Sequence, residues 1–131
     1  MTKIVILVFV GGALGATLRE FLMVLVPQES RGFPLDILAA NLVAAVLLGL
    51  VATLHGRKVA SDAVYALIGT GITGGLSTFS SFAYGSAELM TRSKTSAVVA
   101  LVYVVISLVL GYIAVIVGLR VGDQGGDSSK T

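Results

Sequence analysis

Cysteine and tryptophan are both absent from the 131-residue chain, and it contains only one histidine, His55. Without cysteine there is no disulfide, no thiolate ligand for a metal and no cysteine nucleophile. His55 lacks a second histidine or cysteine with which to bind a transition metal. The chain also lacks a recognisable set of nucleophile, base and orienting residue, so we expect that it is not an enzyme.

Charged side chains are scarce as well, at 12% of residues, against about a quarter in a typical soluble domain. Hydrophobic residues make up 56% of the chain, which leaves too few polar side chains to cover a globule in water. The net charge of +2 is too small and too dispersed for a nucleic-acid-binding surface. The composition therefore excludes a soluble domain and predicts a membrane protein.

Four segments are apolar enough to span a bilayer, for which a helix needs about 20 residues. They cover residues 4–26, 37–54, 63–87 and 97–119 and predict one all-α transmembrane domain over residues 1–121. The N-terminus also resembles a signal peptide, but its apolar run continues to Val26, so we expect it to remain as the first span. Residues 122–131, rich in Gly, Asp and Ser, are expected to form a disordered tail.

Basic residues near the span ends are almost evenly divided between the two sides of the membrane. On the side of the termini lie Lys3, Arg57, Lys58 and Arg120, and on the other side lie Arg31, Arg92 and Lys94. The positive-inside rule needs an asymmetry to set the orientation. Two hypotheses follow: a single, weakly determined orientation, or insertion both ways with antiparallel pairing of two copies.

The third segment is unusual because its centre is rich in glycine. Four glycines fall within seven positions: Gly69, Gly71, Gly74 and Gly75. Each costs about 1 kcal/mol relative to alanine inside a helix, so a break at mid-membrane is one hypothesis, and freed carbonyls there can coordinate a cation. The other hypothesis is a seam for close helix contact, because Gly71 and Gly75, like Gly11 and Gly15, have GxxxG spacing.

Hydroxyl and aromatic residues follow directly: Ser77, Thr78, Phe79, Ser80, Ser81 and Phe82. Four hydroxyls favour the break, because they can bond to freed backbone groups or line a polar path. If a helix resumes near Thr78, then Phe79 and Phe82 share one face of it. Two hypotheses stay open for these rings: they face lipid, or their positive edges help an anion to shed its water.

Several polar residues lie within the first two spans. Asn41 is about one turn into the second span, where an amide needs a partner, either a neighbouring helix or an anion. Arg19 lies about 22 Å along the first helix from Ile4, so it can reach the far interface or draw an anion into a vestibule. A pair between Arg19 and the adjacent Glu20 is not expected, because neighbouring residues point to different faces. We interpret Asp36 as a helix N-cap.

These residues resemble the Fluc fluoride channels, also called CrcB proteins. The first-helix stretch at residues 11–19, GGALGATLR, is similar to the family signature GG-x-x-G-x-x-x-R. Asn41, within LAANL, resembles the asparagine of the family's second helix. The most specific match is TGITGGLSTFSSF at residues 70–82, which is similar to the family's TG-x-x-GGL-[ST]-TFS-[ST]-F break. The resemblance covers the chain except for its tail.

The resemblance implies a channel that exports fluoride passively across the cell inner membrane. It implies an antiparallel homodimer of dual-topology subunits, each with four transmembrane helices and a broken third helix. A structural sodium ion at the dimer interface would be held by the backbone carbonyls of Gly74 and Ser77 from both subunits. Arg19 would supply the cation of a vestibule. The implied fluoride pore is lined by Phe79, Phe82, Asn41, Thr78, Ser80, Ser81, Tyr103 and Ser107.

The match departs from the family pattern at Gly85, which stands where many family members carry a glutamate. Two hypotheses stay open for Glu88, about one turn further on: it substitutes for that glutamate, or it is a charge at the helix end. From the residues alone two other functions stay open. A proton-coupled exporter of the small multidrug type would need a carboxylate deep in the first span, whereas Glu20 lies near its end. An accessory subunit of a larger membrane complex would need no pore.

Overall fold

The computed structural model describes residues 1–25, 34–92 and 94–125, and every regular element in these ranges is a helix. Three helices are long and apolar enough to cross a bilayer. They are α1 (Thr2–Leu25), α2 (Leu35–Gly56) and the stretch Ala97–Gln124 of α6 (Lys94–Gln124). The fourth segment of membrane-spanning length is interrupted. The all-helical membrane fold expected from the composition is thereby confirmed.

The interrupted segment contains the break that its glycines predict. It begins with α3 (Asp62–Val64), which continues as the π-helix η1 (Tyr65–Ile72) and as α4 (Thr73–Leu76). Ser61 caps the start, because its side chain accepts a hydrogen bond from the Val64 amide at 3.3 Å. Ser77 and Thr78 are not helical, and the helix resumes as α5 (Phe79–Arg92). The π-helical stretch was not expected from the sequence.

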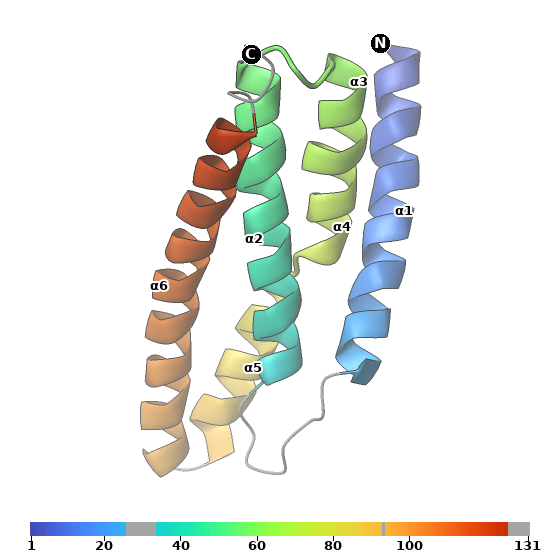
Figure 1. Cartoon of the computed structure of the whole chain (residues 1–131). Coiled ribbons are helices and arrows are strands. Elements are labelled where there is room, and N and C mark those ends of the chain that lie inside the picture. Colours follow the sequence, from blue (N-terminus) through green and yellow to red (C-terminus); the bar gives the residue numbers. More distant parts are fainter. Residues whose placement is uncertain (26–33, 93, 126–131) are drawn as a thin grey trace.

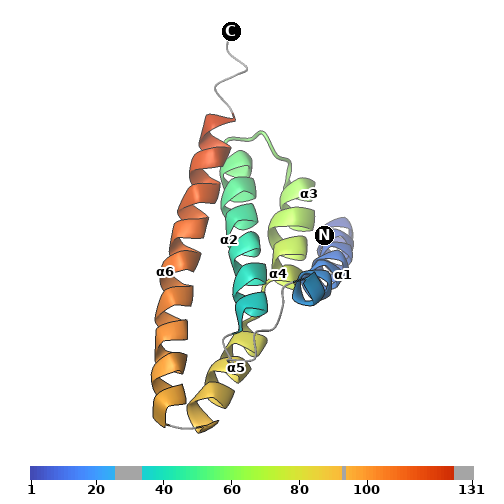
Figure 2. The same ribbon diagram turned by 60° about the horizontal axis from the view of Figure 1, so that its bottom comes forward.

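Two pairs of helices make up the molecule, as Figures 1 and 2 show. In one pair α1 runs beside η1 and α4, and in the other α2 runs beside α6. The N-terminus, the α2–α3 connection and the end of α6 at Gln124 lie at the same end of the bundle, at the top of Figure 1. The half-helix α5 turns away from the axis of α4 and packs on α6 near the opposite end. The break therefore lies between the two pairs.

Close backbone contact holds the first pair together. A Cβ atom on Gly11 would overlap the Leu67 carbonyl oxygen, and one on Gly75 would overlap the Gly12 carbonyl oxygen. Gly15 and Gly71 are equally confined by the facing helix. The small-residue seam and the helix break, two alternatives from the sequence, therefore occur together: the seam ends at Gly75 and the break begins at Ser77.

The structure differs from the sequence-based expectation at the end of α6 and at the start of α2. The helix α6 continues to Gln124, three residues into the predicted tail, while residues 126–131 lie outside the described residues. Val26 and Arg31 lie outside them too. The interpretation of Asp36 as an N-cap is wrong: Pro34 occupies that position, and Asp36 sits buried in the first turn of α2. An acidic group there faces the positive end of the helix dipole.

Candidate functional site: the break and its cavity

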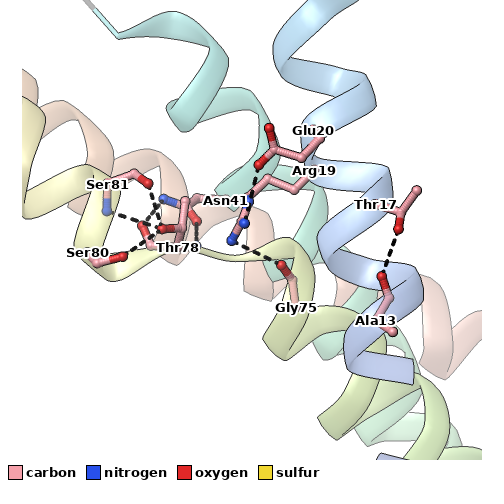
Figure 3. A network of polar contacts seen from close by, with 9 residues as sticks. All are labelled: Ala13, Thr17, Arg19, Glu20, Asn41, Gly75, Thr78, Ser80 and Ser81. Atoms are coloured by element: carbon pink, nitrogen blue, oxygen red, sulfur yellow. Dashed lines mark hydrogen bonds and ion pairs between the residues drawn. The ribbon is translucent and has the colours of Figure 1, made fainter. Parts of the chain in front are cut away.

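Thr78 caps the helix that follows the break. Its Oγ1 accepts a hydrogen bond from the Ser81 amide at 3.1 Å, which is the geometry of an N-cap. The same hydroxyl contacts Ser81 Oγ at 2.9 Å and Ser80 Oγ at 3.3 Å. Three of the four predicted hydroxyl residues thus form one cluster at the start of α5 (Figure 3). Ser77, the fourth, is exposed and has extended backbone, with ψ 147°.

Asn41 of α2 binds the backbone at the break. Its Oδ1 accepts a hydrogen bond from the Thr78 amide at 2.7 Å, and its Nδ2 donates to the Thr78 carbonyl at 3.4 Å. Figure 3 shows the side chain pointing at the non-helical residues. Of the two kinds of partner expected from the sequence, the structure shows a bond within the protein, to the backbone between α4 and α5. Asn41 therefore satisfies backbone groups that would otherwise lie unpaired in the membrane.

Replacing Asn41 with alanine should destabilise the fold, because the Thr78 amide loses its acceptor. We expect a loss of about 2 kcal/mol, the typical cost of leaving a buried backbone group unpaired. Thermal unfolding of the purified protein in detergent measures it. Thr17→Val is the matched control, because the Thr17 hydroxyl bonds only to the Ala13 carbonyl of its own helix and is exposed. Equal stability of the two variants would contradict this role of Asn41.

The interaction with Asn41 also frees a carbonyl of α4. In a continuous helix the Thr78 amide would bond to the Gly74 carbonyl, but here it donates to Asn41. Gly74 is exposed, and a Cβ placed on it would meet no atom within 4 Å. Gly74 and Ser77 both border the same cavity. This end of α4 is also the negative end of its dipole, so the local chemistry suits a hard cation with oxygen ligands.

The Arg19 side chain reaches from α1 to the residues just before the break. Its Nη1 donates to the Gly75 carbonyl at 3.4 Å, and its Nη2 lies 3.3 Å from Glu20 Oε1. The expectation that Arg19 and Glu20 do not pair is wrong, because the long arginine side chain can reach back to an adjacent carboxylate (Figure 3). The pair is exposed on the Glu20 side, so its contribution to stability is small.

Phe79 and Phe82 share one face of α5, as the spacing predicts. Their ring centroids are 6.0 Å apart. Phe79 is 80% exposed in the chain, whereas Phe82 is half-buried against Tyr103 of α6, with centroids 5.4 Å apart. Tyr103 is fully buried, and Ser107 follows it one turn along α6. Local sequence patterns do not predict the contact between Phe82 and Tyr103, because it joins two helices.

A cavity of about 600 Å³ lies between α2, the broken helix and α6. None of its described lining residues is charged. Seven of the predicted site residues border it: Asn41, Gly74, Ser77, Thr78, Phe79, Phe82 and Ser107. Four others are not among the lining residues: Ser80 and Ser81 bond to Thr78, Tyr103 packs against Phe82, and Arg19 binds Gly75.

Neither Gly85 nor Glu88 borders the cavity. A Cβ on Gly85 would lie 3.6 Å from Pro34 Cγ, so this position packs against the start of α2. Glu88 is half-buried on α5, and its backbone carbonyl accepts a hydrogen bond from the Thr91 hydroxyl. The structure therefore places Glu88 outside the described cavity lining.

Most of the chain, including the break, matches the model of one protein family. The family model described as "CrcB-like protein, Camphor Resistance (CrcB)" matches residues 6–119, which contain all the elements at the break. The chain belongs to the CrcB family. This family assignment confirms the resemblance drawn from the glycine, hydroxyl and phenylalanine pattern. Together with the apolar helices, it identifies a multi-pass membrane protein.

Individual CrcB relatives are named as fluoride channels. "Fluoride-specific ion channel FluC 1" of Brucella abortus is 52% identical over 97% of this chain and 47% of that protein. "Fluoride-specific ion channel FluC 3" of Yersinia pseudotuberculosis is 49% identical over 95% of this chain and 92% of that protein. "Fluoride-specific ion channel FluC" of Deinococcus radiodurans is 37% identical, over 87% and 90%. The chain spans about half the length of the Brucella relative.

Proposed function

We propose that the chain forms a channel, not an enzyme, that is selective for fluoride and exports it passively from the cytoplasm across the cell membrane. One observation carries the proposal: hydroxyls and two phenylalanines surround a helix break beside an uncharged cavity. The names of the CrcB relatives supply the ion. The 49% identity to the Yersinia protein, of which the chain covers 92%, is the strongest support for assigning the same ion to this chain.

The chemistry of the lining suits a small, strongly hydrated anion. A pore must replace the water around fluoride with close donors while binding it weakly enough for release. In the lining, the hydroxyls of Thr78 and Ser107 can donate hydrogen bonds, and the ring edges of Phe79 and Phe82 carry partial positive charge. Ser80 and Ser81 are not in the lining and hydrogen-bond to Thr78. A fixed cation within the cavity would hold the ion too tightly. Arg19, outside the lining, instead acts as the vestibule cation and anchors Gly75.

The fluoride proposal is tested by passive efflux from liposomes that contain the purified protein, followed with a fluoride electrode. We expect fluoride to leave down its gradient, with little chloride flux and without a proton gradient. Proton flux driven by a cationic substrate would instead favour the small multidrug type of exporter. A purified protein that conducts no fluoride would be evidence for a non-transporting accessory role and against the channel.

Two copies in antiparallel orientation form the proposed channel. A broken helix is not tolerated against lipid, yet Ser77 and Phe79 are exposed in the single chain. A second copy lying over the cavity would cover them and bring its own break opposite the first. The nearly balanced basic residues permit such pairing, because they let one sequence insert in both orientations.

Dual topology can be tested with a single cysteine added at the C-terminus, since the chain has none of its own. We expect an impermeant thiol reagent outside intact cells to label about half of the chains, because a charge balance without asymmetry favours neither orientation. The remaining half should react only after permeabilisation. Labelling of all chains from one side would contradict antiparallel pairing.

A sodium ion is the proposed structural cofactor of the dimer. The carbonyls of Gly74 and Ser77, two exposed residues at the cavity, offer only two ligands from one chain, which is an incomplete shell for a cation. Two copies that meet at their breaks would offer four. The ion would neutralise two negative helix ends that otherwise repel each other.

Exchanging sodium for N-methylglucamine should lower the thermal stability of the dimer, because the facing helix ends lose their counter-ion. A sodium concentration a hundredfold above the dissociation constant stabilises by about 2.7 kcal/mol, which sets the scale of the expected change. Thermal unfolding in detergent at several sodium concentrations and constant ionic strength measures it. Identical midpoints in both cations would argue against a sodium site.

A further inference from the structure

The helix α6 contains three internal glycines, and packing explains only two of them. A Cβ on Gly118 would overlap the Val46 carbonyl oxygen, and one on Gly122 would lie 2.8 Å from Thr53 Cβ. Both glycines therefore permit close contact between α6 and α2. A Cβ on Gly111, in contrast, would meet no atom within 4 Å. Glycine is less favourable than alanine inside a helix, and contacts within the chain do not explain its presence here.

Gly111 borders the cavity at the break. On the same helix Ser107 and Val115, one turn to either side, border it as well. The three residues form one stripe along α6, because positions four apart lie on the same face of a helix. The missing side chain at Gly111 therefore opens space in the cavity wall, next to the only α6 hydroxyl that the described lining contains.

We propose that Gly111 lines the permeation path, where the absence of a side chain leaves room for fluoride to pass beside Ser107. This inference rests on the proposed channel function and extends it to α6. A dehydrated anion passes only where donors are close and the lumen is unobstructed. Each carbon atom added at Gly111 would project into that lumen, so flux should fall in proportion to the size of the side chain.

A graded series at this position tests the inference. We expect fluoride efflux to fall moderately in Gly111→Ala and by about a hundredfold or more in Gly111→Val, because an obstruction worth 1.4 kcal/mol already reduces a rate tenfold. Gly12→Val is the matched control. A Cβ on Gly12 likewise meets no atom within 4 Å, but Gly12 lies on α1 away from the cavity lining. This control should conduct like the unmodified chain.

A chemical version of the experiment separates blockage from misfolding. The chain has no cysteine, so Gly111→Cys and Gly12→Cys each introduce a single thiol. Reaction with methyl methanethiosulfonate after reconstitution adds a thiomethyl group to a dimer that is already folded. Mass spectrometry measures the extent of reaction. We expect modification to abolish the remaining efflux of Gly111→Cys and to leave that of Gly12→Cys unchanged.

The outcomes distinguish a failure of the Gly111 inference from a failure of the channel proposal. If the unmodified chain conducts fluoride and fully modified Gly111→Cys shows undiminished efflux, the role of Gly111 is overturned and the channel proposal stands. A Gly111 thiol that does not react in the assembled dimer would also overturn it, because a buried helix contact would then explain the glycine. No efflux by the unmodified chain would overturn the channel and, with it, the inference.

Discussion

Fluoride efflux should fall steeply when Phe82 is replaced with isoleucine, while the chain still folds and assembles. Isoleucine keeps an apolar side chain of similar bulk but has no ring edge with partial positive charge. Phe82 lies beside the cavity and against Tyr103, at a centroid distance of 5.4 Å. We expect the rate in liposomes to fall by a factor of about a hundred or more, which corresponds to about 3 kcal/mol of barrier.

Phe79→Ile should impair efflux as well, but with a different effect on stability. Phe79 is 80% exposed in the chain, so its replacement removes little packing within one copy. Phe82→Ile should cost about 1 kcal/mol of stability, because an aromatic pair contributes that much beyond its buried area. Phe9→Ile on α1, 81% exposed and remote from the cavity lining, is the matched control. Normal efflux by Phe82→Ile in an intact dimer would refute its role in the pore.

Local patterns in the sequence were sufficient to predict the helices and the break. Four glycines within seven residues weaken the third helix, and its hydroxyls can satisfy the freed backbone. The spacing of Phe79 and Phe82 placed the two rings on one face without knowledge of any other helix. The contact of Thr78 with Ser81 is local in the same way, because it lies within one helical turn.

Contacts between distant segments could not be predicted in this way. Asn41 was expected to bond to a neighbouring helix or to an anion, and only the fold shows that it bonds to Thr78. Arg19 reaches Gly75, 56 positions along the chain, for the same reason. The resemblance to a family supplied the roles of these residues, whereas their partners follow from the packing of helices whose spacing the glycines determine.

The glycine seam should be intolerant of even one methyl group at Gly11. A Cβ there would overlap the Leu67 carbonyl oxygen and lie 2.9 Å from Gly71 Cα, and both neighbours are backbone atoms that cannot rotate away. In Gly11→Ala the helix α1 must therefore shift from η1, which also weakens the contact that holds Gly75 near Arg19. We expect a loss of about 3 kcal/mol, the upper range for overpacking in a well-packed interior.

Gly12→Ala provides the matched comparison, because it places the same methyl group one residue further along the same helix. A Cβ on Gly12 meets no atom within 4 Å, and alanine favours a helix by about 1 kcal/mol over glycine. Gly12→Ala should therefore unfold at the same temperature as the unmodified chain or slightly above it, and Gly11→Ala well below, with loss of fluoride efflux. Equal unfolding midpoints would mean that α1 can move without cost, in which case the seam does not position the break.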